Sequence, residues 1–264
     1  MGNNPRSTPS RRSLLRAAAA AAGGYTLTRI FAPHPAWADY REKPVKSPAK
    51  LVGRLTFDGQ VPKPVMRDVT SDQNVAGRDP RIWEGLNIGK NKGLKESLLV
   101  VNGVLEGKAL AAEPALTYAQ GAFILPRIAI FGWKEGTKLE FENKDPILHS
   151  WQVYFKGEVK DNRAHPSKMP NVMFDVSDPG LYELRCAPHA WERAFRWAVP
   201  HPYFARTDEE GQFEIADLPE GDYTVDIWSE GLRVKRIWMP VHDDKITLER
   251  SFGSDDLGKA LKGQ

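Results

Sequence analysis

The sequence predicts an all-β protein built from β-sandwiches. Short apolar runs of strand length lie between turn residues, several of them alternate apolar and polar side chains, and no segment keeps a long helical period. The 264 residues are 41% hydrophobic, with 22 glycines and 20 prolines. This composition provides enough apolar material for packed cores and enough chain-breaking residues for many turns.

The first half of the chain predicts a short strand, a long loop and then two apolar runs of strand length. Residues 50–62 are typical of a short strand followed by a turn, and residues 69–96 are polar and glycine-rich without a steady period, as expected of a loop. The apolar run "SLLVVNGVL" at 97–105 predicts a buried strand. Residues 121–131 form another apolar run, and Pro126 within it predicts an edge or kinked strand.

Two later strands place chemically reactive side chains on apolar faces. In "ILHSWQVYF", at 147–155, alternation puts His149 on the same face as Trp151, and in "GLYELRC", at 180–186, it puts Cys186 inward. His189 follows Cys186 by three residues, where a strand gives way to a loop. The pattern therefore predicts that two imidazoles and one thiol meet at one end of a sandwich.

Cys186 is the single cysteine of the chain. It cannot form an internal disulfide, so it is a buried apolar residue, a partner in an intermolecular disulfide or a metal ligand. A soft thiolate with two imidazoles is the ligand set of blue-copper electron-transfer sites, and zinc accepts the same ligands.

The motifs around these residues resemble those of the cupredoxins, the plastocyanin and azurin superfamily. Asn143 and Asp145 precede His149, and P-G-x-Y-x-x-x-C-x-x-H runs from Pro179 to His189. The resemblance covers roughly residues 95–200. It implies a Greek-key β-sandwich, one copper ion per chain bound by His149, Cys186 and His189, and electron transfer to a redox partner.

The sequence departs from the cupredoxin pattern at Glu192, which stands where the family usually has an axial methionine. As a ligand, its carboxylate would favour Cu(II) and lower the reduction potential. Alternatively Glu192 points to solvent, and the axial position is empty or filled by a backbone oxygen. Met169 or Met173 could take its place, or the metal site could have been lost.

The other histidines beyond residue 38 are expected to have structural roles or to face solvent. We interpret His165 as a loop residue, His201 as packing at a domain joint and His242 as a solvated residue in a polar turn.

The C-terminal segment "TDEEGQFEIADLPEGDYTVDIW" resembles the carboxypeptidase regulatory-like, transthyretin-type β-sandwich module. The resemblance implies a smaller sandwich with a stabilising or docking role. Residues 50–62 resemble the first strand of such a module, and the sequence leaves open whether they belong to it or to the cupredoxin-like part.

The N-terminus predicts export. The stretch Ser10–Leu15 contains two consecutive arginines and resembles a twin-arginine signal, an apolar segment follows, and Ala36-Trp37-Ala38 is typical of a cleavage site. An ordinary secretory signal or an uncleaved anchor are the alternatives. We expect a signal peptide at 1–38 with cleavage after Ala38, an N-terminal strand and loop at 39–94, the cupredoxin-like domain at 95–200 and the module at 201–264.

Charge and motif content limit the functional classes. Residues 1–38 hold five of the 37 basic residues and no acidic one, so the remainder carries 32 basic and 34 acidic residues. Such a balance gives no electrostatic case for nucleic acid, and no later segment is apolar enough for a membrane span. Hydrolase, metalloprotease and nucleotide-binding motifs are missing from the sequence.

We therefore expect a periplasmic copper protein that transfers electrons, rather than an enzyme, although a copper with a carboxylate ligand and an open position could be catalytic. Copper storage, or a metal-free interaction module, is the alternative.

Overall fold

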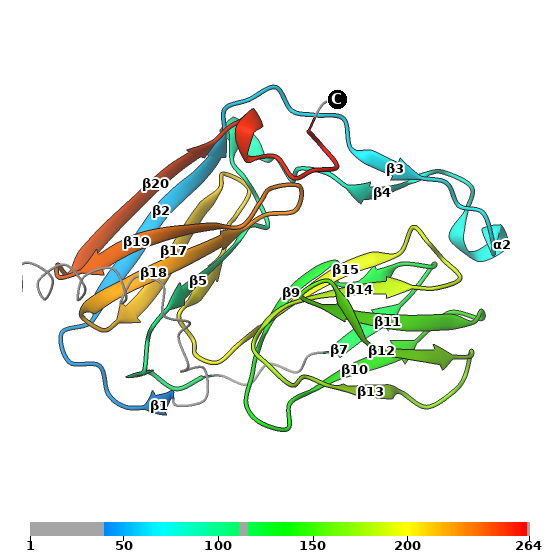
Figure 1. The fold of residues 1–264 in the computed structure, drawn as a ribbon, viewed down its shortest axis with the longest axis horizontal. Helices are drawn as coiled ribbons and strands as arrows, with labels where there is room; N and C mark the ends of the chain where they lie inside the picture. The colour runs from blue at the N-terminus through cyan, green and yellow to red at the C-terminus, as the bar shows by residue number, and fades with distance from the viewer. Residues whose placement is uncertain (1–39, 111–115, 263–264) are drawn as a thin grey trace, which may run out of the picture. The chain divides into compact units, whose positions relative to one another are not determined.

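The computed structural model describes residues 40–110 and 116–262. The expected signal peptide at 1–38 and its cleavage point lie outside the described residues. Within the described residues nearly all regular structure is strand, which confirms the all-β class (Figure 1). No helix in these two ranges has the length and apolar character needed to cross a membrane.

The first sandwich contains two sheets. One has the strand order β13-β10-β7-β8 and the other β12-β11-β14-β15-β9. The smaller sheet is made of β7 (Leu116–Ala119), β8 (Ile124–Leu125), β10 (Lys138–Asn143) and β13 (Val172–Asp175). The larger sheet is made of β9 (Ile128–Gly132), β11 (His149–Phe155), β12 (Glu158–His165), β14 (Gly180–Cys186) and β15 (Arg193–Val199). Pro126 lies between β8 and β9, which belong to different sheets. Proline has no N–H group to donate to a neighbouring strand, so a break between two strands is favoured at this position.

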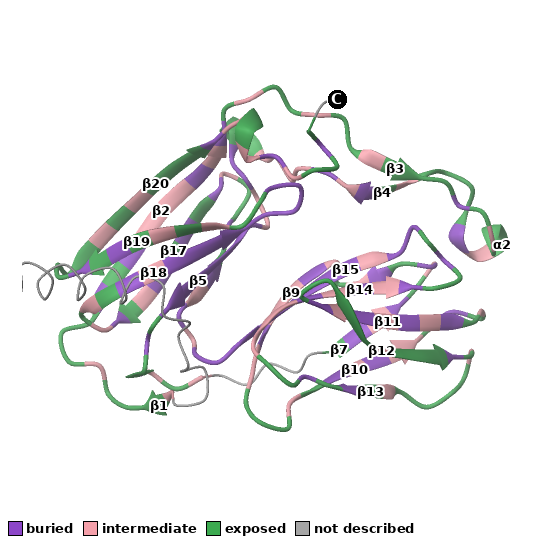
Figure 2. Cartoon of the chain, viewed as in Figure 1, coloured by how far each residue is buried: buried purple, intermediate pink, exposed green. Residues whose placement is uncertain are grey.

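One buried cluster joins the two sheets of the first sandwich. It includes Phe141 and Phe174 from the smaller sheet and Trp151 and Leu184 from the larger one. Burial alternates along β11 from its first residue to its last, as the period-2 pattern of the sequence predicts (Figure 2). The same alternation turns His149 toward the interior at one end of the sandwich.

The second sandwich combines strands from both ends of the chain. Its sheets have the orders β16-β5-β18-β19 and β17-β2-β20. They are made of β2 (Ala49–Phe57), β5 (Leu98–Asn102), β16 (Phe204–Arg206), β17 (Gln212–Leu218), β18 (Gly221–Trp228), β19 (Lys235–Val241) and β20 (Lys245–Phe252). Because β2 pairs with β17 and β20, the early strand belongs with the C-terminal strands, which answers the question that the sequence left open.

Strand β5 lies in this second sandwich, although it falls inside the range 95–200 expected for the cupredoxin-like domain. It pairs with β18 and β16. All five of its residues are buried. On one face Leu99 and Val101 belong to the core of the second sandwich, and on the other Leu98 and Val100 belong to a separate cluster with Phe195 of β15. An apolar run buried on both faces does not indicate which sheet it joins.

The expected loop at 69–96 contains regular structure. Residues 65–84 form a segment that we call the arm. It contains β3 (Val65–Arg67), the one-turn helix α2 (Gln73–Ala76) and β4 (Arg81–Glu84). Strands β3 and β4 pair antiparallel. The remaining elements are the parallel pair β1 (Arg41–Glu42) and β6 (Glu106–Gly107) and the 3-10 turns η1 (Lys90–Lys92) and η2 (Ser254–Asp256).

Candidate metal centre

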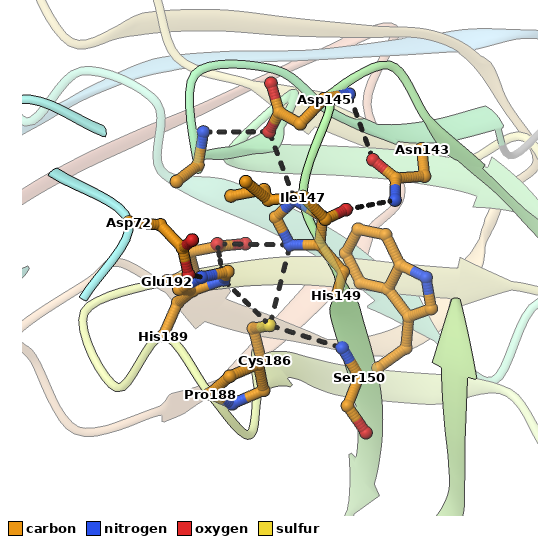
Figure 3. Close-up of polar contacts among 12 residues, drawn as sticks. Asp72, Asn143, Asp145, Ile147, His149, Ser150, Cys186, Pro188, His189 and Glu192 are labelled. Atoms are coloured by element: carbon orange, nitrogen blue, oxygen red, sulfur yellow. Dashed lines mark hydrogen bonds and ion pairs between the residues drawn. The ribbon is translucent and has the colours of Figure 1, made fainter. Parts of the chain in front are cut away.

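Four side chains converge at one end of the first sandwich. We call them the donor cluster: His149, Cys186, His189 and Glu192. Their ligand atoms all lie within 4.8 Å of one another, and none of the four residues is more than 3% exposed. These are the four residues that the sequence singled out, and the structure brings them all together (Figure 3).

The distances within the donor cluster fit a single metal ion. Sγ of Cys186 lies 3.5 Å from Nδ1 of His149 and 3.4 Å from Nδ1 of His189. Oε1 of Glu192 lies 3.2 Å from Nδ1 of His149 and 2.8 Å from Nδ1 of His189. Ligand atoms bound to one ion at about 2.0–2.3 Å are about 3–4.5 Å apart. The donor set of one sulfur, two nitrogens and one oxygen therefore matches a metal site in size and in chemistry.

Strand pairing and a tight turn position these residues. The register of β11 against β14 places Trp151 opposite Cys186, and the backbone N–H of Ser150 donates to Sγ of Cys186 over 3.4 Å. Beyond β14, the N–H of Glu192 donates to the carbonyl of His189. This turn brings two side chains that are three residues apart in sequence onto the same side of the loop.

Asp145 contacts the far edge of the His149 ring. Its Oδ2 lies 3.1 Å from Nε2 of His149, and its two oxygens accept hydrogen bonds from the backbone N–H groups of Gly121 and Ala122. Asn143 donates to the carbonyl of Ile147 and so fixes the loop that leads into β11. A buried carboxylate in this place requires that Nε2 of His149 be a hydrogen-bond donor.

Asp72, from the arm, contacts His189 in the same way. Its Oδ2 lies 3.0 Å from Nε2 of His189 (Figure 3). With both Nε2 atoms facing carboxylates, the Nδ1 atoms of the two imidazoles are the nitrogens that face Sγ of Cys186 and the buried carboxylate of Glu192. A buried carboxylate in this place is stable only beside positive charge, which either protonated imidazoles or a bound metal ion supply.

The electrostatics of the donor cluster favour a cation. Burial alone would lower the pKa of His149, but its contacts with Cys186 and Glu192 outweigh burial and raise that pKa to about 10. For His189 burial is outweighed in the same way, with Asp72 as a third contributor, and its pKa rises to about 11. Burial raises the pKa of the Cys186 thiol, and the two histidines more than compensate, so that it is lowered.

The structure removes two alternatives for the fourth position of the site. The alternative in which Glu192 points to solvent is wrong, because the residue is only 1% exposed and faces both imidazoles. The alternative in which Met169 or Met173 replaces it is not supported either, since these residues are 55% and 42% exposed.

The other three histidines of the described ranges lie outside the donor cluster. His165 ends β12 instead of lying in a loop, and its Nδ1 accepts a hydrogen bond from Nε1 of Trp151. His201 is buried and packs against the ring of Tyr203, whereas His242 is exposed and pairs with Asp222, as expected of a residue in a polar turn.

Sequence reasoning missed Asp72 and gave no role to Asp145. Asp145 stands four residues before His149, so a carboxylate close to a predicted ligand was a usable signal. Asp72 lies 117 residues from its partner in a segment expected to be a loop, and nothing local in the sequence connects the two.

Comparison with known proteins gives partial similarities only. No family model matches the chain, and no curated protein matches it in sequence. Among solved structures, it is similar to a copper-containing nitrite reductase (NirK) from Thermus scotoductus SA-01, at 20% identity and a TM-score of 0.27. That match covers 35% of this chain and 24% of the reductase, so the chain spans less than two thirds of that protein. It is also similar to a purple cupredoxin from Nitrosopumilus maritimus, at 17% identity and a TM-score of 0.27, over 32% of this chain and 98% of the cupredoxin.

Proposed function

We propose that the donor cluster binds one copper ion per chain and that the protein transfers single electrons. The observation that carries this proposal is the convergence of four buried side chains whose ligand atoms all lie within 4.8 Å of one another. Both imidazoles are held by carboxylates at Nε2, so their Nδ1 atoms are left to bind an ion. Four intact donors also argue against the alternative of a lost site.

The donor types support copper. A thiolate and two imidazoles suit copper in either oxidation state, and bound copper would supply one-electron exchange between Cu(I) and Cu(II). The protein contributes a rigid frame, because His149 and Cys186 lie in paired strands and Ser150 holds the sulfur from the backbone. A frame that changes little with oxidation state favours fast electron exchange.

The closed geometry of the site favours electron transfer over catalysis. Catalytic metal sites keep a position open for substrate, whereas closed sites with four protein ligands are typical of structural or electron-transfer metals. In this chain all four donor residues are buried, and the arm covers the His189 edge.

Structural zinc binding is a second candidate, and the oxygen of Glu192 is the observation that favours it. A hard carboxylate donor together with two imidazoles and a thiolate matches a closed tetrahedral zinc site. The two candidates differ in redox behaviour, because zinc does not change its oxidation state.

The location and the partner follow as parts of the same proposal. The twin-arginine-like stretch at 10–15 supports export to the periplasm after folding, so that metal would enter the site in the cytoplasm. The pattern of residues 207–228 supports a transthyretin-type module in the second sandwich, and we propose that this module docks to the redox partner or stabilises the chain.

Reversible reduction of the copper-loaded protein tests this function. Loading with Cu(II) is expected to produce an intense visible thiolate-to-copper band that disappears with ascorbate and returns with an oxidant. The zinc-loaded protein serves as the colourless control. Tight binding of one metal ion without a reversible band would favour the structural zinc site, and failure to bind copper would overturn the proposal.

A further inference from the structure

The arm lies against the loop that carries His189 and Glu192. The guanidinium of Arg67 donates to the carbonyl of Ala190 over 3.1 Å, and the hydroxyl of Ser71 donates to the carbonyl of Pro188 over 3.3 Å. Two buried arm residues, Val69 and Ala76, share a small apolar cluster with Trp191 of the loop. The arm therefore contacts the loop through both polar and apolar groups, and the loop residue His189 is completely buried.

Asp72 occupies an unusual position within the arm. It is the N-cap of α2, with φ 45° and ψ 36° in the left-handed region, and its side chain makes no capping hydrogen bond. An aspartate at an N-cap ordinarily accepts a hydrogen bond from a backbone N–H of its own helix, which stabilises the helix. Here the carboxylate is directed to Nε2 of His189 instead (Figure 3).

The two histidines of the donor cluster are held by different parts of the chain. His149 is held by Asp145, four residues away, whereas Nε2 of His189 contacts Asp72, 117 residues away. A carboxylate at Nε2 fixes the tautomer and the orientation of a metal-binding imidazole and makes its other nitrogen a stronger donor.

We propose that Asp72 is a positioning residue for the metal site and that the arm serves to deliver it. Asp72 holds His189 with Nδ1 directed at the ion and adds a negative charge that favours Cu(II) over Cu(I). This inference deepens the proposed function and rests on it. The competing explanation is that the contact is a partly exposed ion pair on a segment whose docking matters only for stability, since the side chain of Asp72 is 38% exposed.

Four variants separate these explanations. Asp72→Ala removes both the charge and the hydrogen-bond acceptor, whereas Asp72→Asn keeps an acceptor and removes the charge. Ser71→Ala weakens arm docking without touching His189. Asp68→Asn removes the same charge from an exposed residue of the same arm and so controls for long-range electrostatics.

The measurements are the Cu(II) affinity by chelator competition and the Cu(II)/Cu(I) reduction potential, with near-ultraviolet circular dichroism to check that each variant is folded. We expect Asp72→Ala to lower the Cu(II) affinity 10–100-fold, as loss of such partners typically does. Asp72→Asn should lose less, because it still orients the imidazole. If Cu(I) affinity stays constant, each tenfold loss raises the potential by about 59 mV. Asp68→Asn and Ser71→Ala should stay within about threefold of the wild type.

Each outcome bears on a different claim. If wild-type protein binds copper and Asp72→Ala binds it equally well, the positioning role is overturned while the copper site stands. If Ser71→Ala loses as much affinity as Asp72→Ala, arm docking rather than the carboxylate is responsible, and the inference fails. If the wild type binds no copper, the proposed function and this inference both fall.

Discussion

Oε1 of Glu192 and Nδ1 of His189 lie 2.8 Å apart, and the two residues are three positions apart in the same loop. In the cupredoxin pattern that the sequence resembles, the position of Glu192 carries a methionine, which is a weak and soft ligand. A buried carboxylate beside two imidazoles and a thiol makes the donor set harder and more negative. Glu192 is therefore both the residue that departs from the family pattern and the fourth member of the donor cluster.

Replacing Glu192 with methionine is expected to raise the reduction potential of the copper-loaded protein, because a neutral soft ligand favours Cu(I). We expect at least a tenfold change in the preference between the two oxidation states, or about 59 mV. Potentiometric titration of the visible band measures it, and Glu192→Gln separates the loss of charge from the change in ligand type. Identical spectra and potentials in Glu192→Met and the wild type would mean that Glu192 is not a ligand.

Removing the metal should destabilise the protein. An ion present at 1,000 times its dissociation constant stabilises the folded state by about 4 kcal/mol, which for a chain of this size raises Tm by roughly 10 °C. The physical reason is that the ion neutralises buried donor atoms that otherwise repel one another or retain protons. Calorimetry with and without stoichiometric copper tests this, and a Tm that does not respond to copper would contradict it.

Tyr182 of β14 makes a partly buried hydrogen bond that supports the first sandwich. Its hydroxyl donates to the carbonyl of Asp178 over 2.8 Å, and the residue is 1% exposed. Tyr182→Phe should lower the free energy of unfolding by about 1 kcal/mol, the usual net value of such a bond. Tyr154→Phe, on the neighbouring strand, serves as the matched control, because Tyr154 is less buried and its hydroxyl makes only a long contact of 3.4 Å to Oε1 of Gln152. Equal effects of the two variants in urea denaturation would argue against the role assigned to Tyr182.

Acid should weaken an ion-pair network on the larger sheet. Burial raises the pKa of Glu183, but Arg185 and Arg193 outweigh burial and hold that pKa below its ordinary value of 4.5. A carboxylate whose pKa is lowered on folding contributes stability that is present above 4.5 and is lost as the pH falls through its folded-state pKa. The stability difference between wild type and Glu183→Gln in urea denaturation should therefore shrink as the pH falls below 4.5. A difference that stays constant there would refute this assignment.

The sequence predicted the interior of the first sandwich better than its surroundings. Alternation along β11 and β14 is a local signal, and it placed His149 and Cys186 on the core face, where the structure has them. Burial of Glu192 was left open, because one residue in a loop carries no periodic signal. The pairing of β2 and β5 with C-terminal strands, and the contact of Asp72 with His189, depend on long-range packing that local patterns do not encode.

Binding of one copper ion by the four side chains is tested most directly by anomalous diffraction from a crystal of the copper-loaded protein. We expect one strong peak at the copper absorption edge, about 2.0–2.3 Å from Nδ1 of both histidines, Sγ of Cys186 and an oxygen of Glu192. A copper-loaded crystal without a peak among these four atoms, or with its copper bound elsewhere, would contradict it.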